Sequence, residues 1–397
     1  MLKKTAYLEE LSIDGKGSYG IAASAVPFSD ELYTYLRITD INDDGTINFN
    51  ALKSVEHEKA KDYILKPNDI VFARTGASTG RNYFYDGSDG EFVYAGFLIK
   101  FSIDEKKVNP KYIKYYCQSN QYKDWVKSFN TGSTRGNINA KTFGKLEIPL
   151  ISRKEQDKLV KILSSIDNKI KINKEINNNL LEQIFSIYKK IFIDNINENR
   201  KICRADEYFD ISIGKTPPRK EQHWFSMNKE DVRWVSISDM GNCGVYINNS
   251  SERLTKLAVD RHKIKIVPDN TVILSFKLTV GRIAITNGEM VTNEAIAHFK
   301  TENKYINEYL YCYLKHFNFK TMGSTSSIAT AINSKIIKGM PFVIPDEDEI
   351  EYFHSIALPI FNKIKINQLE IEKLNDLRDR LLPELISGKL NLSDVDI

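Results

Sequence analysis

The chain of 397 residues contains little of what metal sites and disulfide frameworks are made from. Its cysteines lie far apart without any CxxC pair, and its histidines form neither an HExxH motif nor another pair. These residues are Cys117, Cys203, Cys243 and Cys312, and His57, His223, His262, His298, His316 and His354. Zinc sites need closely spaced ligands, so no metal centre is expected, and a lone histidine is usually structural. Scattered thiols fit a reducing cytoplasm, where we expect the protein to reside.

Recognisable catalytic and nucleotide-binding motifs are missing as well. The sequence has no GxxxxGK phosphate loop ending in Ser or Thr and no GxSxG nucleophile elbow. The loop at residues 76–80 lacks the GxGxxG spacing of a dinucleotide site. The Thr-Pro-Pro-Arg stretch at residues 216–219 lacks the donor residue and the aromatic ring that amino-methyltransferases place beside a flipped base. We therefore expect this chain to supply no catalytic residue, no metal and no cofactor.

Long apolar runs are also missing. No segment could cross a bilayer, and polar residues, rather than the apolar core of a signal peptide, follow Met1–Lys4. Hydrophobic residues make up 42% of the chain, which suits a soluble globular protein without membrane contact. The 56 basic and 52 acidic residues give a net charge of +4, which permits nucleic-acid binding without showing it. A chain of this length is expected to form two or more domains.

The chain does contain a long repeat. The hexamer Asn-Lys-Ile-Lys-Ile-Asn at residues 168–173 recurs letter for letter at residues 362–367, 194 positions later. A period of this length indicates a duplicated structural unit.

Both copies of the hexamer lie in a pattern of apolar residues every three or four positions, which predicts one apolar face on a long helix. The first face comprises Leu159, Ile162, Ile166, Ile170, Asn173, Ile176, Leu180, Ile184, Ile187 and Ile191, and the second comprises Phe353, Ile356, Ile360, Ile364, Asn367, Ile371, Leu374, Leu377, Leu381 and Leu385. One asparagine on an otherwise apolar seam fixes the register of paired helices at a cost in stability. We predict that the helices pack antiparallel, with Asn173 and Asn367 setting the register. The alternative is that both asparagines face solvent.

Residues at the ends of these helices carry the expected stop and start signals. Ser152 and Glu155 form a capping box before the first helix, and Asp346 and Glu349 occupy the same places before the second. Gly388 is expected to end the second helix. The sequence predicts that Pro359 and Pro383 interrupt or kink it, because proline cannot donate an intrahelical hydrogen bond.

The regions before the two helices share one mixed plan of strands, turns and helices. In the first region we expect strands at 33–38, 70–73 and 146–150, turns at 42–45 and 66–69, and a helix at 109–125. The second region repeats landmarks of the first with drifting offsets: Asp40 and Asp239, Pro67 and Pro268, Gly80-Arg81 and Gly281-Arg282, and Gly132-Ser133-Thr134 and Gly323-Ser324-Thr325. The predicted fold class is α+β, with globular domains at 1–151 and 196–345 and helical spacers at 152–195 and 346–390.

Two loops in each globular region combine cations with hydroxyl groups and are our candidate binding residues. The first region contributes Arg74, Thr75, Ser78, Thr79, Arg81, Ser133, Thr134, Arg135 and Asn137, and the second contributes Lys215, Arg219, Lys277, Thr279, Arg282, Ser324, Thr325, Ser326 and Ser327. Arginine can fork onto guanine and asparagine onto adenine, while hydroxyl groups hold phosphates. Such loops at matched places predict contact with nucleic acid. The alternative is that they are solvated turns capped by their own hydroxyl groups.

Two diverged globular domains, each followed by a near-identical long helix, resemble the specificity subunit of type I restriction-modification systems. The resemblance covers essentially the whole chain. Its most specific local features are residues 148–150 followed by Glu155-Gln156, the repeated helices, and the tail at residues 380–390. The second helix departs from the family's Glu-Gln start and carries Glu349-Ile350.

The resemblance implies two target-recognition domains, each reading one half of a bipartite double-stranded DNA site, and two antiparallel helical spacers that give the molecule an approximate two-fold symmetry. It also implies partners: two methyltransferase subunits docked on the helices, and motor-nuclease subunits for cleavage. S-adenosylmethionine, ATP and Mg²⁺ would then belong to those partners, which agrees with the missing motifs.

Two alternatives from other functional classes remain open at the level of sequence. The chain could be a self-contained DNA-modifying enzyme with an unrecognised site, or a coiled-coil adaptor without DNA contact. Methyl-donor binding by the isolated chain would favour the enzyme. An adaptor would not need a second, diverged globular domain.

Overall fold

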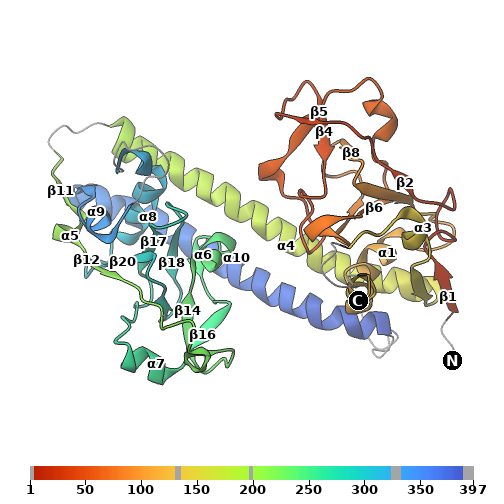
Figure 1. Cartoon of the computed structure of the whole chain (residues 1–397). Helices are drawn as coiled ribbons and strands as arrows, with labels where there is room; N and C mark the ends of the chain where they lie inside the picture. The colour runs from red at the N-terminus through yellow and green to blue at the C-terminus, as the bar shows by residue number, and fades with distance from the viewer. Residues whose placement is uncertain (1–3, 130–135, 196–199, 323–331, 388–397) are drawn as a thin grey trace. The chain divides into compact units, whose positions relative to one another are not determined.

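The computed structural model describes residues 4–129, 136–195, 200–322 and 332–387. The chain divides into two compact units, residues 1–168 with 375–397 and residues 169–374 (Figure 1). Each unit combines sheets with helices, which confirms the predicted mixed fold class. Among the described residues, no helix has the combination of length and apolarity that a bilayer crossing requires.

Unit 1 is built on two four-stranded sheets. One has the strand order β2 (Ser18–Tyr19), β9 (Leu98–Ser102), β6 (Asp69–Ala73) and β7 (Asn82–Tyr85). The other has the order β3 (Ala25–Val26), β5 (Lys53–Val55), β4 (Tyr33–Leu36) and β8 (Phe92–Tyr94), with β4 and β8 parallel. An antiparallel pair, β1 (Lys4–Tyr7) and β10 (Glu147–Leu150), joins the start of the unit to the segment before the long helix.

Strand β6 lies between two apolar layers, because successive side chains in a strand point to opposite faces. Ile70 and Phe72 pack with the helices of the unit, whereas Val71 and Ala73 pack with residues of the second sheet. All five residues of β6 are buried, so the loop that leaves this strand starts from a rigid base. The predicted strands at 70–73 and 146–150 and the predicted turns are confirmed, and the strand predicted at 33–38 ends at Leu36.

The helix predicted at residues 109–125 is wrong as a single element. It forms two helices, α1 (Pro110–Tyr116) and α2 (Asn120–Lys127), with a break between them. The Ser119 hydroxyl accepts a hydrogen bond from the Tyr122 backbone N–H at 3.3 Å, which caps a new helix at this point. A third short helix, α3 (Ala140–Gly144), starts at Asn139, whose side chain accepts from the Thr142 N–H at 2.9 Å.

Unit 2 repeats this topology strand for strand and adds one strand. The sheet orders are β12 (Asp210–Ile213), β20 (Ile296–Lys300), β17 (Val272–Ser275), β18 (Ile283–Thr286) and β15 (Tyr246–Ile247), then β13 (Phe225–Ser226), β16 (Glu252–Leu254), β14 (Val232–Val235) and β19 (Val291–Thr292). Strands β11 (Ile202–Arg204) and β21 (Pro341–Val343) form the antiparallel pair. The helices are α5 (Ala205–Tyr208), α6 (Ile237–Asn242), α7 (Lys256–Arg261), α8 (Asn307–His316) and α9 (Ser334–Lys338). The shared strand order supports a duplication.

The two long helices are α4 (Arg153–Tyr188), which continues as a π-helix to Asp194, and α10 (Glu347–Ser387), coloured yellow-green and blue in Figure 1. Their first residues have the same separation as the two hexamers. The Ser152 and Glu155 capping box is confirmed, with the Ser152 N–H donating to the Glu155 carboxylate at 2.9 Å. The Glu349 carboxylate accepts hydrogen bonds from Arg200 Nη2 at 3.0 and 2.9 Å.

The helices run antiparallel within each unit, as predicted. In unit 2, the Asn173 amide donates to Glu370 at 2.8 Å, and the Asn367 amide donates to Asn177 at 2.8 Å. Asn173 and Asn367 are 2% and 1% exposed, so the alternative that they face solvent is wrong. They do not bond to each other, because each meets a different partner one turn along the seam.

Most residues assigned to the apolar faces lie there, although some are less buried than a neighbour. Ile162 and Ile360 are half-buried and pack against the cores beside the fully buried Leu163 and Phe361. Ile176 is 37% exposed and its assignment is wrong, because Asn177 is the buried residue there. On α10, Leu377 is also 38% exposed. Positions three and four residues along a helix lie on the same side, so spacing alone does not decide which of two neighbours faces the partner helix. The paired helices place a second polar residue, Asn177, in the seam.

The predicted interruption of the second helix by proline is wrong. Helix α10 is one element of 41 residues that contains both Pro359 and Pro383. Both prolines lie on the exposed side, where water can satisfy the carbonyl group that each leaves without an intrahelical donor. The predicted stop at Gly388 lies outside the described residues.

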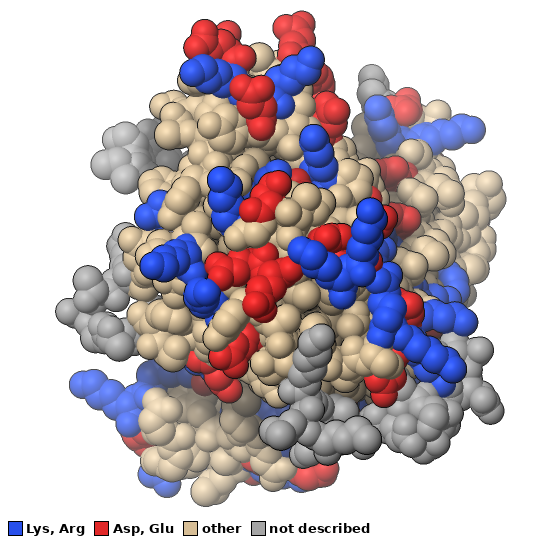
Figure 2. Space-filling view, turned by 90° about the vertical axis from the view of Figure 1, so that its right-hand side faces the viewer, with Lys and Arg blue, Asp and Glu red and all other residues tan. Residues whose placement is uncertain are grey.

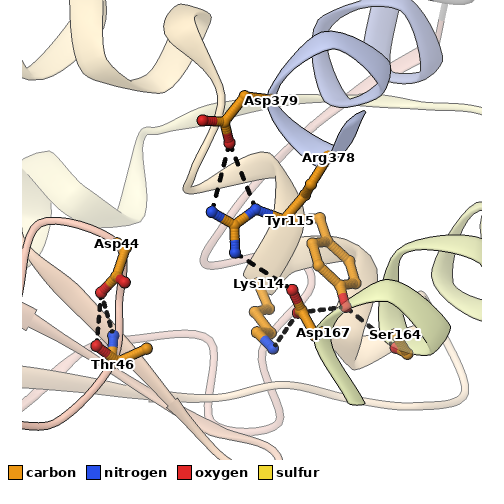
Figure 3. Close-up of polar contacts among 8 residues, drawn as sticks. All are labelled: Asp44, Thr46, Lys114, Tyr115, Ser164, Asp167, Arg378 and Asp379. Atoms are coloured by element: carbon orange, nitrogen blue, oxygen red, sulfur yellow. Dashed lines mark hydrogen bonds and ion pairs between the residues drawn. The ribbon is translucent and has the colours of Figure 1, made fainter. Parts of the chain in front are cut away.

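In unit 1, a charged cluster around Asp167 connects the long helices to the globular part (Figure 3). The Asp167 carboxylate accepts from the Tyr115 hydroxyl at 2.9 Å and from Lys114 Nζ at 3.1 Å, and it lies 3.4 Å from Arg378 Nη1. The positions in unit 2 that correspond through the repeat hold apolar Phe361 and Ile184, both 0% exposed. The same kind of helix contact is therefore ionic in one unit and apolar in the other.

Candidate nucleic-acid interface

The candidate loops at residues 74–81 and 276–282 connect equivalent strands, β6 to β7 and β17 to β18. At the base of each loop, a backbone N–H donates to the carbonyl of the closing arginine: Ala73 to Arg81 at 2.8 Å, and Ser275 to Arg282 at 2.9 Å. The glycine before each arginine has a positive φ, +85° at Gly80 and +90° at Gly281. The two loops therefore close in the same way.

Glycine is required at position 80 for a second reason. A Cβ atom there would lie 2.4 Å from a methyl carbon of Val126, and the backbone conformation also disfavours other residues. The hydroxyl group of Tyr122 donates to the Gly80 carbonyl at 2.6 Å. Helix α2 thus fixes one end of this loop against the core of unit 1.

The first candidate loop of unit 1 lies beside Gly136 and Asn137, the described end of the second candidate loop. Thr75 and Asn137 form an isolated β-bridge, and the Ile138 N–H donates to the Arg74 carbonyl at 2.9 Å. The Thr79 hydroxyl donates to the Gly136 carbonyl at 2.9 Å. Ser133, Thr134 and Arg135 lie outside the described residues. Segments some 60 residues apart in the sequence therefore form one surface.

Arg74 is at the centre of that surface. Its guanidinium lies over the Tyr19 ring, 5.0 Å from the ring centroid, and its Nη2 is 3.5 Å from the Asn137 side-chain oxygen. The buried Nε of Arg74 has no partner among the described residues. A ligand cannot reach that buried nitrogen, but the terminal nitrogens belong to an oriented guanidinium whose contact with Asn137 is long, which suits an incoming acceptor such as a guanine edge or a phosphate.

Arg81 and Arg282 carry equivalent structural contacts. Arg81 Nη1 donates to the Ile41 carbonyl at 3.2 Å, and Arg282 Nη1 donates to the Ile237 carbonyl at 2.5 Å. Arg81 also pairs with Asp43 at 2.7 Å, but Asp43 is 86% exposed and such a surface pair is weak. Each arginine therefore ties its hairpin to the segment after β4 or β14, and base reading by Arg81 would require it to release Asp43.

Two candidate cations of unit 2 have different partners. Arg219 forms a bidentate pair with Glu252 at 2.8 and 2.9 Å and lies over the rings of Phe225 and Trp234, at 4.3 and 4.6 Å. Lys215 Nζ donates to the His262 carbonyl at 2.8 Å.

At the loop between β17 and β18, Lys277 and Thr279 are both exposed. Ser78, by contrast, is buried at the base of its loop in unit 1. Ser324, Thr325, Ser326 and Ser327 lie outside the described residues. Lys277 and Thr279 are therefore the described candidates of unit 2 best placed to contact a ligand.

Three exposed apolar or aromatic residues near these loops were missed by the sequence reasoning. Tyr19 and Phe97 beside Arg74 are 42% and 59% exposed, and Leu278 between Lys277 and Thr279 is 99% exposed. No sequence pattern distinguishes them from buried neighbours such as Leu98 and Phe276. Over the face seen in Figure 2, Lys and Arg are mixed with Asp and Glu. Whether a cation can contact a ligand therefore depends on the residues that surround it.

Burial keeps two titratable groups of unit 2 in their neutral forms. Burial raises the pKa of the Cys243 thiol to about 11, and it lowers the pKa of His298 to about 3. A thiol with a raised pKa is a poor nucleophile at neutral pH. Within the described ranges, no three metal-ligating side chains cluster.

Comparison with known proteins places these features in a family. Residues 28–182 and 197–376 both match the family described as type I restriction modification DNA specificity domain. The MjaIX type I restriction enzyme specificity subunit of Methanocaldococcus jannaschii is 26% identical over 317 residues, covering 74% of this chain and 72% of that protein. The HindI specificity subunit of Haemophilus influenzae is 20% identical over 443 residues, covering 90% and 95%.

A solved structure shares the fold. The crystal structure of the type I restriction-modification S subunit from M. genitalium superposes with a TM-score of 0.55 at 17% identity, covering 96% of this chain and 95% of that one. The two family matches together span most of the sequence, one in each half. The chain therefore belongs to the family of type I restriction-modification DNA specificity proteins.

Proposed function

We propose that this chain reads a bipartite duplex DNA site with the hairpin loops of its two units and contributes no catalytic group of its own. The observation that carries the proposal is the matched pair of loops between β6 and β7 and between β17 and β18. Each loop leaves a buried strand, closes through a glycine and an arginine, and presents polar and basic side chains. Rigidly based loops of this composition suit phosphate and base-edge contacts.

Within this proposal, the target-recognition domains are residues 1–151 and 196–345, and residues 152–195 and 346–390 are the helical spacers. The described candidates for DNA contact are led by Arg74 and Asn137 in unit 1 and by Lys277 and Thr279 in unit 2. The remaining sequence candidates, including those at 133–135 and 324–327, stay in the proposed contact set. We expect the affinity for DNA to depend on the residues of the paired loops rather than on the net charge of the chain.

The partners proposed are two methyltransferase subunits and the motor-nuclease subunits of a type I system, which would carry S-adenosylmethionine, ATP and Mg²⁺. The exposed part of the repeated hexamer supports two copies of one partner. Ile170 and Ile364 are buried in the helix seam, which explains their repetition. Ile172 and Ile366 are 50% and 58% exposed, so the seam does not explain theirs.

Identical outward residues on two helices suit identical partner surfaces. Replacing either Ile172 or Ile366 by Asp should remove one methyltransferase subunit per chain, and replacing both should remove two. Light scattering of the purified complex measures this stoichiometry. Two bound methyltransferases in the double variant would rule out this docking surface.

The proposed DNA contact is tested by electrophoretic mobility shift with duplex DNA carrying the target, with and without the methyltransferase partner. Arg74→Ala should weaken binding by about 1–3 kcal/mol if the guanidinium reads a base. The matched control is Lys61→Ala, which removes an exposed cation of the same unit that belongs to neither loop. Equal affinities of Arg74→Ala and the unmodified chain at low salt would remove Arg74 from the interface.

A further inference from the structure

Leu278 is an apolar side chain presented entirely to solvent at the tip of the loop between β17 and β18. It is 99% exposed, more than any other large hydrophobic residue among those described. Its neighbours Lys277 and Thr279 are also exposed. A single exposed leucine is ordinary on a protein surface. What distinguishes Leu278 is the backbone conformation that holds it there.

The backbone at this leucine is strained. Leu278 has a φ of +61°, and the Thr279 N–H donates to the Lys277 carbonyl at 2.6 Å, two residues back. A three-residue turn with a positive φ at its centre is rare, and it is unfavourable for a residue with a branched side chain. Asparagine or glycine would relieve the strain, yet the tip carries leucine.

A buried serine holds the loop in this shape. Ser275 is 0% exposed; its hydroxyl donates to the Thr279 carbonyl at 2.6 Å and accepts from the Arg282 N–H at 3.1 Å. The Gly281 N–H donates to the Ser275 carbonyl at 3.0 Å. Strained conformations persist where the surrounding structure over-determines them, and they concentrate at functional sites. The turn is therefore a built feature that aims Leu278 outward.

Unit 1 presents an exposed apolar residue at the same edge of its sheet. The Arg74 N–H donates to the Phe97 carbonyl at 3.0 Å, and in unit 2 the Phe276 N–H donates to the Ala295 carbonyl at 2.9 Å. The loops after β8 and β19 are thus equivalent neighbours of the hairpins. Phe97, 59% exposed, stands beside Arg74, whereas Leu278 stands beside Lys277. Each unit combines a cation with an apolar side chain at this edge.

Building on the proposed function, we propose that Leu278 is a wedge that enters between two stacked base pairs of the half-site contacted by unit 2. Apolar side chains that open a base step in this way trade lost stacking for a deformed duplex that meets more protein surface. Lys277, next in the chain, supplies charge for a phosphate beside the opened step. The half-site should then be selected partly by how easily that step unstacks.

The test uses the full chain in complex with its methyltransferase partner and target duplexes that carry the fluorescent base 2-aminopurine at successive positions. The unmodified complex should raise the fluorescence at one step of the unit 2 half-site, because unstacking relieves quenching. Leu278→Ala should abolish that rise and weaken binding about tenfold, from the apolar area it no longer buries. Leu278→Met should retain both, since methionine is also long and apolar.

The matched control is Leu257→Ala, because Leu257 on α7 is a 65% exposed leucine of the same unit. It should leave affinity and fluorescence unchanged. A Leu278→Ala complex with unmodified affinity, or with an unmodified fluorescence rise, would overturn the wedge. So would loss of the methyltransferase from that variant, which would make Leu278 a protein contact. Failure of the unmodified complex to bind any duplex would instead contradict the proposed function.

Discussion

Arg74 and Arg81 belong to one loop and differ in what surrounds them. Arg74 lies on the Tyr19 ring with an unpartnered Nε, whereas Arg81 is held by Asp43 and the Ile41 carbonyl. Both were candidates in the sequence because they are the same residue type in the same loop. Which cation keeps donor capacity depends on contacts from residues more than 30 positions away, and no local pattern contains that information.

His298 gives a residue-scale prediction about stability. Its ring nitrogens lie 3.0 Å from the Ser212 hydroxyl and 2.7 Å from the Thr292 hydroxyl, and burial lowers its pKa from 6.5 to about 3. Between these values the unfolded chain binds a proton that the folded chain does not. The stabilising effect of the neutral ring is therefore complete above pH 6.5 and is lost as the pH falls toward 3.

His298→Gln should remove this part of the pH dependence while keeping a polar side chain between the two hydroxyl groups. In the unmodified protein, His298 should contribute a slope of up to about 1.4 kcal/mol per pH unit to the free energy of unfolding between pH 4 and 6. Urea denaturation at several pH values measures the slope, and a series at pH 7.5 gives the pH-independent cost of the substitution. Parallel curves for both proteins would show that His298 is not the source.

At the scale of elements, the helix seam is polar at its centre in unit 2. Asn173, Asn177 and Asn367 are all buried, and Asn367 Oδ1 has no partner among the described residues. Replacing Asn173 by Leu should preserve or raise the melting temperature, because the buried amide is removed and its partner Glu370 is partly exposed to water. Replacing Asn367 by Leu removes the unpartnered Oδ1 but leaves the buried Asn177 Oδ1 without its donor, so this variant should melt at a lower temperature than Asn173→Leu. Either substitution should also loosen the register, because Leu packs at several registers where Asn does not.

Because the helices are proposed to act as a spacer, a change of their register should alter which DNA gap lengths the complex binds. Complexes of the Asn173→Leu and Asn367→Leu variants should bind sites with one base pair added to or removed from the gap better than the unmodified complex does. Affinities for a set of duplexes that differ only in the gap measure this. Unchanged discrimination between gap lengths would contradict a register role for the asparagines.

An internal repeat does not determine how the long helices contact each globular part. Asp167 and Arg378 form an ion pair in unit 1, where the repeat-related residues of unit 2 are Phe361 and Ile184. Periodicity predicted the helices, because a helix follows from the spacing of apolar residues. Their antiparallel pairing was predicted from the symmetry expected of a duplicated chain. Periodicity did not predict which neighbour of each pair is buried, the continuous helix through Pro359 and Pro383, or the break at Ser119, because packing decides these.

At the scale of the whole molecule, duplication was the most predictable feature. The exact hexamer and the matched landmarks predicted two similar units and two similar helices, and the strand orders of the units agree with that. The candidate loops could be placed because glycine and arginine mark where the hairpins close. Tyr19, Phe97 and Leu278 could not be selected, since their exposure is a property of the folded surface.

The central claim is that one chain reads two half-sites at a set distance. Selection of bound duplexes from a random library by the complex of this chain with its methyltransferase, followed by sequencing, tests it most directly. We expect two short specified sequences separated by an unspecified gap of constant length. A single continuous specified sequence, or two specified sequences at variable distance, would contradict it.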